Sequence, residues 1–517
     1  MAFSPDRRDM IVYTVFAYAN ALLVLVLLAG ALVTARRPAP PDTGSIADEQ
    51  RTTAEANLDH LAASLRSYAV VSKKRRPQLD IHIFGLPGAS SLNSAIETRV
   101  LDAIDDAGGF DGRAAFEPTP TAPAHRWSTT SFTSPRSLGG GSPSSQSGES
   151  AHSHGGGPPH SRGENSPSQE ENSPSQEESP RGSQDGERIG DPHTLDIRTT
   201  VLTAGGRFVV TALRQASSRS HTAVLLTDLS ADTTVDAKSL FSARVDPAAI
   251  STDDTGSLTV DGQPVADADL TAVGTAVVAD LHTPLEIPRP GDLRTPDYSC
   301  TLLPCVALTY DDGPGEPKTE DVLLDAADEA NIRLTYFLLG QNIHEFPNVA
   351  ERIAAAGHEV DNHTFKHQRL DLLSKGALKH EIGRTQKSLS HVGGSDQALV
   401  RPPYGALDKP AAHALGAPAI IWDVDTGDWR DRSPKKTVQN VRSHARPGSV
   451  VLMHSIHPST VKAAPKVFTT VADKGLYAVT VRELFAGIKW EKGGSYFCRG
   501  YWDELCSNPE HPSVHKN

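Results

Sequence analysis

Two adjacent carboxylates, Asp311 and Asp312, follow a short apolar run in the sequence. The run from Val306 to Leu308 predicts a buried strand, which Gly313-Pro314 ends abruptly. Neighbouring side chains on a strand point opposite ways, but a loop at the strand end relaxes that constraint. One Asp is then free to bind a cation while the other accepts a proton. On these residues alone, an Asp-Asp-Gly-Pro surface turn without chemistry is the alternative.

Two imidazoles further along the chain favour the chemical interpretation. His363 and His367 are four positions apart, which on a helix or tight turn places both rings on one face at metal-ligand spacing. Two neutral imidazoles and one carboxylate make a three-ligand site with an open position, and such a site is typical of a catalytic metal.

Five motifs, taken together, resemble the polysaccharide deacetylases that share the NodB homology domain, carbohydrate esterase family 4. They occur in the family's order within roughly residues 300–487, and they are Thr309-Tyr310-Asp311-Asp312-Gly313-Pro314, His363-Thr364-Phe365-Lys366-His367, Arg401-Pro402-Pro403-Tyr404, Asp425-Thr426-Gly427-Asp428-Trp429 and Leu452-Met453-His454. The resemblance implies a distorted, incomplete (β/α) barrel and the removal of acetyl groups from a glycan, as in peptidoglycan N-acetylglucosamine deacetylases.

The resemblance also implies a metal site made by Asp312, His363 and His367. These ligands suit Zn²⁺, with Co²⁺ or Ni²⁺ as alternatives. Water on the metal would have a pKa of about 7 and would attack the acetyl carbonyl. Asp311 corresponds to the family's general base, and Arg401 to the residue that holds this base and keeps it ionised.

The remaining motif residues match roles on the substrate side. The backbone N–H of Tyr404 would stabilise the oxyanion, His454 would protonate the leaving amine, and Asp428 would orient His454. The acetyl pocket would be lined by Trp429, Leu452 and Pro403, although Leu452 by itself reads as a core strand residue.

Two positions depart from the family pattern. Ser455 follows His454 where many members carry Asp, and Tyr310 replaces a common Phe. The first change alters the charge next to the expected acid without removing the acid.

Elements that position these residues alternate between strands and helices beyond Cys300, which predicts parallel strands with helical crossovers. The expected strands are 306–310, 334–339, 359–362, 399–401, 420–422, 450–454 and 477–481, and the expected helices are 318–330, 349–356, 377–391, 437–445 and 461–474. The motifs fall at or just after strand ends, which is the active-site face of such barrels. The fold class is therefore α/β, a distorted barrel of about seven parallel strands.

Length and net charge limit the number of domains and the kinds of partner that the chain can have. At 517 residues it exceeds one core, and its net charge of −13 argues against nucleic acid as a partner. The apolar stretch 11–34 is long enough to cross a bilayer core of about 30 Å at about 1.5 Å per residue. We expect an uncleaved single-pass anchor, with a cleaved secretory signal as the alternative.

A second folded part precedes the barrel. Before a polar tract, the sequence predicts a helix over 45–69, a strand over 79–84 and a helix through Leu92 and Ile104. After the tract it predicts strands at 194–202, 207–213 and 221–227 and a hairpin over 257–265. Together these elements predict an α+β accessory domain. Its intervening Ser-, Pro-, Gly- and Glu-rich tract has too few aliphatic residues to order itself.

The composition divides the chain into eight segments. They are a short tail (1–10), the anchor (11–34), the first part of the accessory domain (45–116), the disordered insertion (117–190), the second accessory part (191–283), a linker (284–299), the deacetylase domain (300–490) and a tail with a Cys pair (491–517).

Four cysteines flank the deacetylase domain, and they allow three pairings. We expect the local bridges Cys300–Cys305 and Cys498–Cys506, with free buried thiols as the alternative. Bridges of this kind form in an oxidising compartment, so they would place the bulk of the chain outside the cytoplasm.

These observations predict a membrane-anchored, metal-dependent deacetylase that acts outside the cell on a cell-wall polysaccharide, with the N-acetylglucosamine of peptidoglycan as the expected substrate. Chitin-type oligosaccharides and acetylxylan are the alternatives within the family. A non-catalytic wall sensor is the alternative of another class, but the metal ligands and both acid–base residues are present. The sequence indicates no protein partner.

Overall fold

The computed structural model of the chain describes residues 43–72, 78–109, 194–216, 220–253, 255–289, 292–397 and 399–500. All of these belong to one compact unit. The expected anchor (11–34) and the expected disordered insertion (117–190) both lie outside the described residues, so both stay predictions. Among the helices that are described, none is long and apolar enough to span a bilayer.

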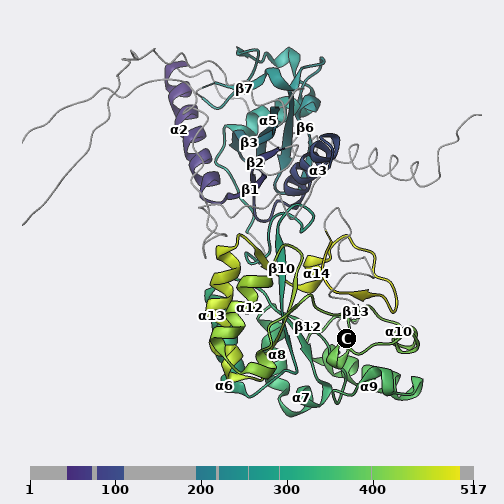
Figure 1. Ribbon diagram of the computed structural model, residues 1–517. Helices are drawn as coiled ribbons and strands as arrows, with labels where there is room; N and C mark the ends of the chain where they lie inside the picture. The colour runs from purple at the N-terminus through teal and green to yellow at the C-terminus, as the bar shows by residue number, and fades with distance from the viewer. Residues whose placement is uncertain are drawn as a thin grey trace, which may run out of the picture. The chain divides into compact units, whose positions relative to one another are not determined.

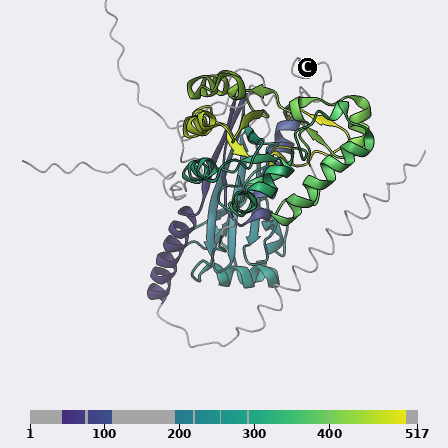
Figure 2. The ribbon, with the colours of Figure 1, turned by 90° about the horizontal axis from the view of Figure 1, so that it is seen from below.

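A six-stranded sheet in the order β1-β2-β3-β4-β5-β6 forms the centre of the accessory part (Figures 1 and 2). The strands are β1 (Arg66–Ser72), β2 (Gln78–Gly85), β3 (Thr194–Gly205), β4 (Phe208–Ala216), β5 (His221–Asp228) and β6 (Thr233–Asp236), and the helices are α2 (Thr43–Ala62), α3 (Ser90–Asp106) and α5 (Ala272–Leu281). A small sheet adds β7 (Ile250–Thr252), β8 (Leu258–Val260) and β9 (Gln263–Pro264), and the 3₁₀ turns are 237–240, 247–249 and 267–269. The central sheet is antiparallel except for the parallel pair β2–β3, whose strands come from either side of the undescribed segment 110–193.

Both faces of this sheet are covered, because alternate side chains point to opposite faces. Val209 of β4 belongs to the same buried cluster as Ile96 of α3, whereas Val210 belongs to the cluster that contains Val277 of α5. The predicted α+β organisation of this part is therefore observed.

The helix expected over residues 45–69 is too long. α2 ends at Ala62, and the chain enters β1 at Arg66. Burial alternates along β1, and the strand pairs with β2 over its whole length. Sheet pairing has overridden the helical spacing of this stretch.

The deacetylase part carries parallel strands surrounded by helices (Figure 1). Its strands are β10 (Cys305–Asp311), β11 (Thr335–Leu338), β12 (Glu359–Asn362), β13 (Ala419–Ile420), β14 (Val424–Asp425), β15 (Val450–His454), β16 (Tyr477–Val479) and β17 (Ser495–Tyr496). Its helices are α6 (Pro317–Glu329), α7 (Gly340–Glu345), α8 (Pro347–Ala355), α9 (Lys375–His391), α10 (Lys409–Leu415), α11 (Asp428–Asp431), α12 (Pro434–His444), α13 (Pro458–Asp473) and α14 (Val481–Leu484), with 3₁₀ turns at 370–372 and 403–405.

These strands close into an incomplete barrel. The sheet runs β12-β11-β10-β15-β14, and single bridges through Val400 continue it from β12 to β13. Because only three residues separate β13 from β14, the two ends of this path meet again. The predicted barrel of parallel strands is confirmed.

Strand parity decides which β10 side chains reach the barrel interior. Val306, Leu308 and Tyr310 pack in the cluster beneath α6, α8, α12 and α13, so their neighbours Thr309 and Asp311 face inward. The two carboxylates expected at the strand end therefore lie at the mouth of the barrel.

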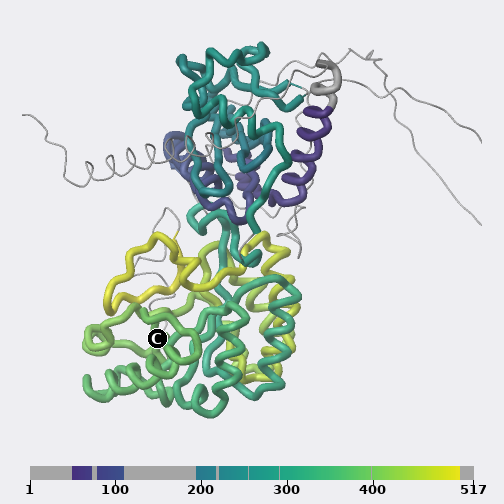
Figure 3. The backbone as a smooth tube through the Cα atoms, turned by 180° about the vertical axis from the view of Figure 1, so that it is seen from behind, coloured from purple at the N-terminus to yellow at the C-terminus, as the bar shows by residue number. Residues whose placement is uncertain are grey.

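Details of the barrel differ from expectation where elements are very short. Residues 399–401 contribute only the bridge at Val400, and 477–481 changes from strand to helix at Val481. The two-residue strands β14 and β17 were not anticipated, because two residues show no period. β17 pairs with β13, and Figure 3 shows this yellow C-terminal segment returning beside the green part of the chain.

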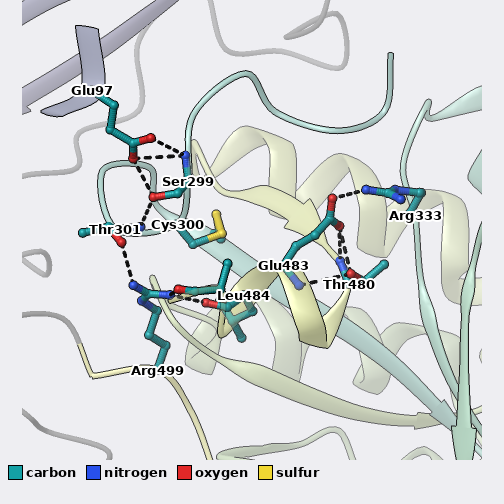
Figure 4. The surroundings of a disulfide bond; sticks show 11 residues. Glu97, Ser299, Cys300, Thr301, Arg333, Thr480, Glu483, Leu484 and Arg499 are labelled. Carbon is teal, nitrogen blue, oxygen red and sulfur yellow. Dashed lines mark hydrogen bonds and ion pairs between the residues drawn. A yellow bond between two sulfur atoms is a disulfide. The ribbon is translucent and has the colours of Figure 1, made fainter. Parts of the chain in front are cut away.

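One of the expected disulfides is present. Cys300 is bonded to Cys305, the first residue of β10, in the surroundings that Figure 4 shows. Cys506 lies outside the described residues, so its bridge to Cys498 stays a prediction.

Candidate metal centre and active site

Asp311 ends β10 and is held by a buried arginine. The Nη1 atom of Arg401 donates to Asp311 Oδ1 over 2.7 Å and to Thr309 Oγ1 over 2.6 Å. Its other donors reach the carbonyls of Ile420 and Ile421 at 3.2 and 3.0 Å, and its guanidinium lies over the Phe337 ring. Arg401 is completely buried, so each donor needs a partner inside the barrel, and the partners found fix where Asp311 points.

The predicted ligands Asp312, His363 and His367 come together. One ligating atom from each lies within 4.8 Å of the others, and Asp312 Oδ1 is 3.5 Å from His363 Nε2 and 3.4 Å from His367 Nε2. Asp312 is in the left-handed region at φ 68°, which turns it away from the strand direction. Asn342 Nδ2 fixes this turn by donating to the Asp312 carbonyl over 2.7 Å.

The two histidines lie on a tight turn between β12 and α9, not on a helix. Thr364 and His367 have φ values of 69° and 57°, so the turn contains two left-handed residues. A buried carboxylate, Glu381 on α9, holds the turn by accepting from the N–H groups of Phe365 and Lys366 at 3.1 and 2.8 Å. The imidazoles converge because α9 anchors the backbone between them.

These residues fit a divalent metal. His363 Nδ1 lies 2.7 Å from the Arg401 carbonyl and must donate to it, which leaves Nε2 unprotonated on the side of Asp312. Asp312 Oδ1 is buried and has no hydrogen-bond partner among the described residues. Burial raises the pKa of Asp312, but the imidazoles, His363 foremost, outweigh burial when they are protonated and hold that pKa well below its usual range. An ionised carboxylate and an imidazole lone pair directed at the same space are a metal-ligand arrangement.

On the other side of Asp311, His454 ends β15 and is paired with Asp428. His454 Nδ1 lies 3.0 Å from Asp428 Oδ1, and the His454 backbone N–H donates to Asp428 Oδ2 over 2.8 Å. The carboxylate also accepts from Thr426 and Thr460. Burial lowers the pKa of His454, but Asp428, assisted by Asp311 and Asp312, raises it above its ordinary value.

The other predicted residues lie around this centre. Tyr404 has φ 61°, and its ring packs edge-on against His367 with centroids 4.7 Å apart. Trp429 is 46% exposed on α11, so its ring is accessible, whereas Leu452 and Pro403 are buried. The barrel thus brings every predicted site residue to one end of the strands.

Sequence reasoning missed the residues that hold the site in place. Glu381, Glu320 and Thr460 are buried helix residues that bond to the catalytic loops. Glu320 is on α6 and receives a hydrogen bond of 2.5 Å from Ser455 Oγ, beside the position where the chain departs from the family. On a helix an isolated Glu or Thr resembles a solvated residue, so no sequence signal distinguished these three.

Comparisons with known proteins agree with the geometry. The family model for polysaccharide deacetylases matches residues 299–419. A peptidoglycan-N-acetylglucosamine deacetylase of Bacillus cereus is 36% identical over 194 residues, covering 36% of this chain and 70% of that protein. The deacetylase PgdA of Listeria monocytogenes, which bears the same functional description, is 36% identical over 192 residues, covering 37% of this chain and 41% of PgdA. The peptidoglycan-N-acetylmuramic acid deacetylase PdaC of Bacillus subtilis is 36% identical over 180 residues, covering 35% of this chain and 38% of PdaC.

The barrel, its five motifs and these similarities show that the chain belongs to the polysaccharide deacetylase family, whose members are hydrolases. The similarity covers about two fifths of PgdA and of PdaC.

Proposed function

We propose that this chain is a metal-dependent deacetylase that hydrolyses N-acetyl groups of a cell-wall glycan, with the N-acetylglucosamine of peptidoglycan as its substrate. The observation that carries the proposal is the arrangement of two acid–base groups beside one metal-ligand cluster. Asp311, bound to Arg401, and His454, bound to Asp428, end adjacent paired strands beside Asp312, His363 and His367. Hydrolysis of an amide needs both a base for the water and an acid for the amine.

Asp312, His363 and His367 are the residues that would hold the metal, with Zn²⁺ as our first choice. When bound, a divalent metal lowers the pKa of coordinated water to about 7 and polarises the carbonyl that it contacts. The chain's own residues supply the other steps. Asp311, held in place by Arg401, accepts the proton of the attacking water. The backbone N–H of Tyr404 donates a hydrogen bond to the developing oxyanion.

His454 protonates the leaving amine from Nε2, because its Nδ1 is engaged by Asp428. The raised pKa of His454 keeps a larger share of the ring protonated near neutral pH. Trp429 offers an accessible aromatic face to the sugar, and Leu452 with Pro403 borders the acetyl group. Peptidoglycan is favoured over chitin-type oligosaccharides and acetylxylan because the three relatives described above carry peptidoglycan in their names.

We also propose that residues 11–34 anchor the protein in the cell membrane with the deacetylase domain outside the cytoplasm. The support is the unbroken apolar stretch and the Cys300–Cys305 disulfide, which forms in oxidising compartments. Cell fractionation distinguishes an anchor from a secretory signal. An uncleaved anchor keeps the full chain in the membrane fraction after a salt or alkali wash. A cleaved signal leaves a shorter chain that the wash releases.

The deciding experiment measures acetate released from isolated peptidoglycan by the full chain with Zn²⁺ or Co²⁺ added. We expect wild type to release acetate and Asp311→Asn to lose about 10²–10⁴-fold in rate, the usual contribution of acid–base catalysis. Asp473→Asn, an exposed change on α13, should match wild type. Treatment with a chelator should abolish release and re-addition of metal should restore it.

Acetate release that survives both Asp311→Asn and chelation would contradict the proposal. If peptidoglycan is inert, chitin oligomers and acetylxylan are assayed in parallel. Release from one of those reassigns the substrate, and inertness of all three favours a non-catalytic wall-binding role.

A further inference from the structure

Glu320 is buried between the barrel and its helical layer, at the start of α6. Its side chain is completely inaccessible. One of its oxygens, Oε1, accepts two hydrogen bonds, from the Gly315 backbone N–H at 2.8 Å and from Ser455 Oγ at 2.5 Å. A single carboxyl oxygen therefore joins two segments that are far apart in the sequence.

Both segments carry residues of the proposed active site. Gly315 lies three positions after Asp312, in the loop that leaves β10. Ser455 follows His454 directly, in the turn that leaves β15. The backbone between the two is tight, since a Cβ added at Gly313 would lie 3.0 Å from Ser455 Oγ and 3.4 Å from Glu320 Oε1. A shift of Glu320 would reach the metal-binding loop and the acid-bearing turn together.

Burial acts against the charged form of Glu320. No cation lies within ion-pair distance of it among the described residues. Burial raises its pKa against the opposing effect of the hydrogen bonds from Ser455 and Gly315. Glu320 Oε2 and the hydroxyls of Tyr310 and Tyr336 are buried without hydrogen-bond partners among the described residues. Tyr310 and Tyr336 stack with ring centroids 5.7 Å apart in the same outer layer.

We propose that Glu320 is a positioning residue for this site, which holds the loop 312–316 and the turn at His454-Ser455 at a fixed separation through Oε1. The inference rests on the proposed deacetylase function for its catalytic consequence, but the structural tie stands on the two hydrogen bonds alone. It also gives the Ser at position 455 a role, since its hydroxyl donates to the carboxyl where an Asp would place a second carboxyl beside it. Ser455 and Glu320 are then a matched pair across two elements.

The test uses the full chain and compares Glu320→Ala, Glu320→Gln and Ser455→Ala, with Glu329→Ala as a matched control on the exposed side of α6. Amide hydrogen exchange is measured over residues 313–316 and 453–457, together with kcat and KM for acetate release. Gln keeps the Oε1 acceptor and the shape, so Glu320→Gln should retain slow exchange and a kcat within a few-fold of wild type.

Glu320→Ala should speed exchange in both segments by about tenfold, the worth of roughly one hydrogen bond. Its kcat should fall by about 10–100-fold with little change in KM, because misplacement of reacting groups slows chemistry more than binding. Ser455→Ala should speed exchange in 453–457 only. This variant decides the matter if Glu320→Ala does not fold.

If Glu320→Ala speeds exchange in neither segment, or equally across the whole chain, Glu320 does not hold the two segments together. A Glu320→Gln enzyme as slow as Glu320→Ala overturns the positioning role, because charge rather than geometry would then matter. If wild type releases no acetate from any glycan, the proposed function fails while the exchange measurements still decide whether Glu320 joins the two segments.

Discussion

Among its neighbours, Asp428 has the largest effect on the protonation of His454. Burial alone lowers the pKa of this imidazole, and the hydrogen-bonded carboxylate more than reverses that effect. Because the folded-state pKa is raised, the stability from this pair is present at low pH and is lost as pH rises through the folded-state pKa. The same titration sets the alkaline limb of activity if His454 is the acid.

We therefore expect Asp428→Asn to move the alkaline limb of the kcat/KM profile to lower pH. The amide no longer favours the imidazolium, so burial dominates the pKa of His454. At neutral pH kcat should also fall, by up to the roughly 10²–10⁴-fold that a general acid contributes. A pH profile of acetate release measures both effects. The control is Asp425→Asn, an exposed residue three positions before Asp428. An unmoved alkaline limb would argue against His454 as the acid.

At the scale of elements, α9 helps to determine where the two histidines proposed as metal ligands meet. Glu381 is buried in α9 and accepts from the two backbone N–H groups midway between His363 and His367. Two further bonds hold the left-handed residues of this turn: the Thr364 N–H donates to Asn362 Oδ1 over 2.9 Å, and the His367 N–H donates to Thr364 Oγ1 over 3.0 Å. Glu381 adds the only bonds that come to the turn from α9 among the described residues. The helix thus positions the proposed metal ligands through hydrogen bonds to their backbone turn.

Glu381→Ala should weaken Zn²⁺ binding by about 10–100-fold, as loss of a group that orients metal ligands usually does. Glu381→Gln retains an acceptor and should bind much more tightly than Glu381→Ala. Competition with a fluorescent chelator measures the Zn²⁺ affinity. The control is Glu351→Ala, at an exposed position of α8. Equal affinities for the Ala variant and wild type would show that the turn orders itself.

The element scale also shows what the sequence could and could not predict. Asp311 and His454 were placed correctly at strand ends because apolar runs and turn residues mark such ends locally. Glu320 and Glu381 were missed because burial of a helical Glu depends on which face packs against the barrel, and nothing near it in the sequence reports that. The first four residues of β1 were mistaken for helix because the partner strand, and not these residues, decides their conformation.

At the scale of the molecule, one buried cluster extends from the accessory sheet into the barrel. Leu92 and Ile96 of α3 belong to the same cluster as Leu302 and Ala307 around the start of β10. Glu97 of α3 accepts from both the backbone N–H and the hydroxyl of Ser299, next to the disulfide (Figure 4). The accessory part and the barrel are therefore expected to unfold together.

Glu97→Ala should lower the free energy of unfolding by about 1–3 kcal/mol, because two donors of Ser299 lose their acceptor in a largely buried place. Urea denaturation should still show one transition, since the shared cluster remains. Asp102→Ala, on the exposed face of the same helix, should leave the midpoint unchanged. Two separate transitions in wild type would mean that the parts are independent.

The short strand β17 has a consequence for the proposed base. The Tyr496 carbonyl accepts from the Ile421 N–H over 2.8 Å, and the carbonyls of Ile420 and Ile421 receive two donors of Arg401, which in turn holds Asp311. β17 thus supports Asp311 of the first motif through three successive hydrogen bonds, by way of Ile421 and Arg401. A protease that clipped the chain near residue 490 would leave every catalytic side chain in place and still loosen the base.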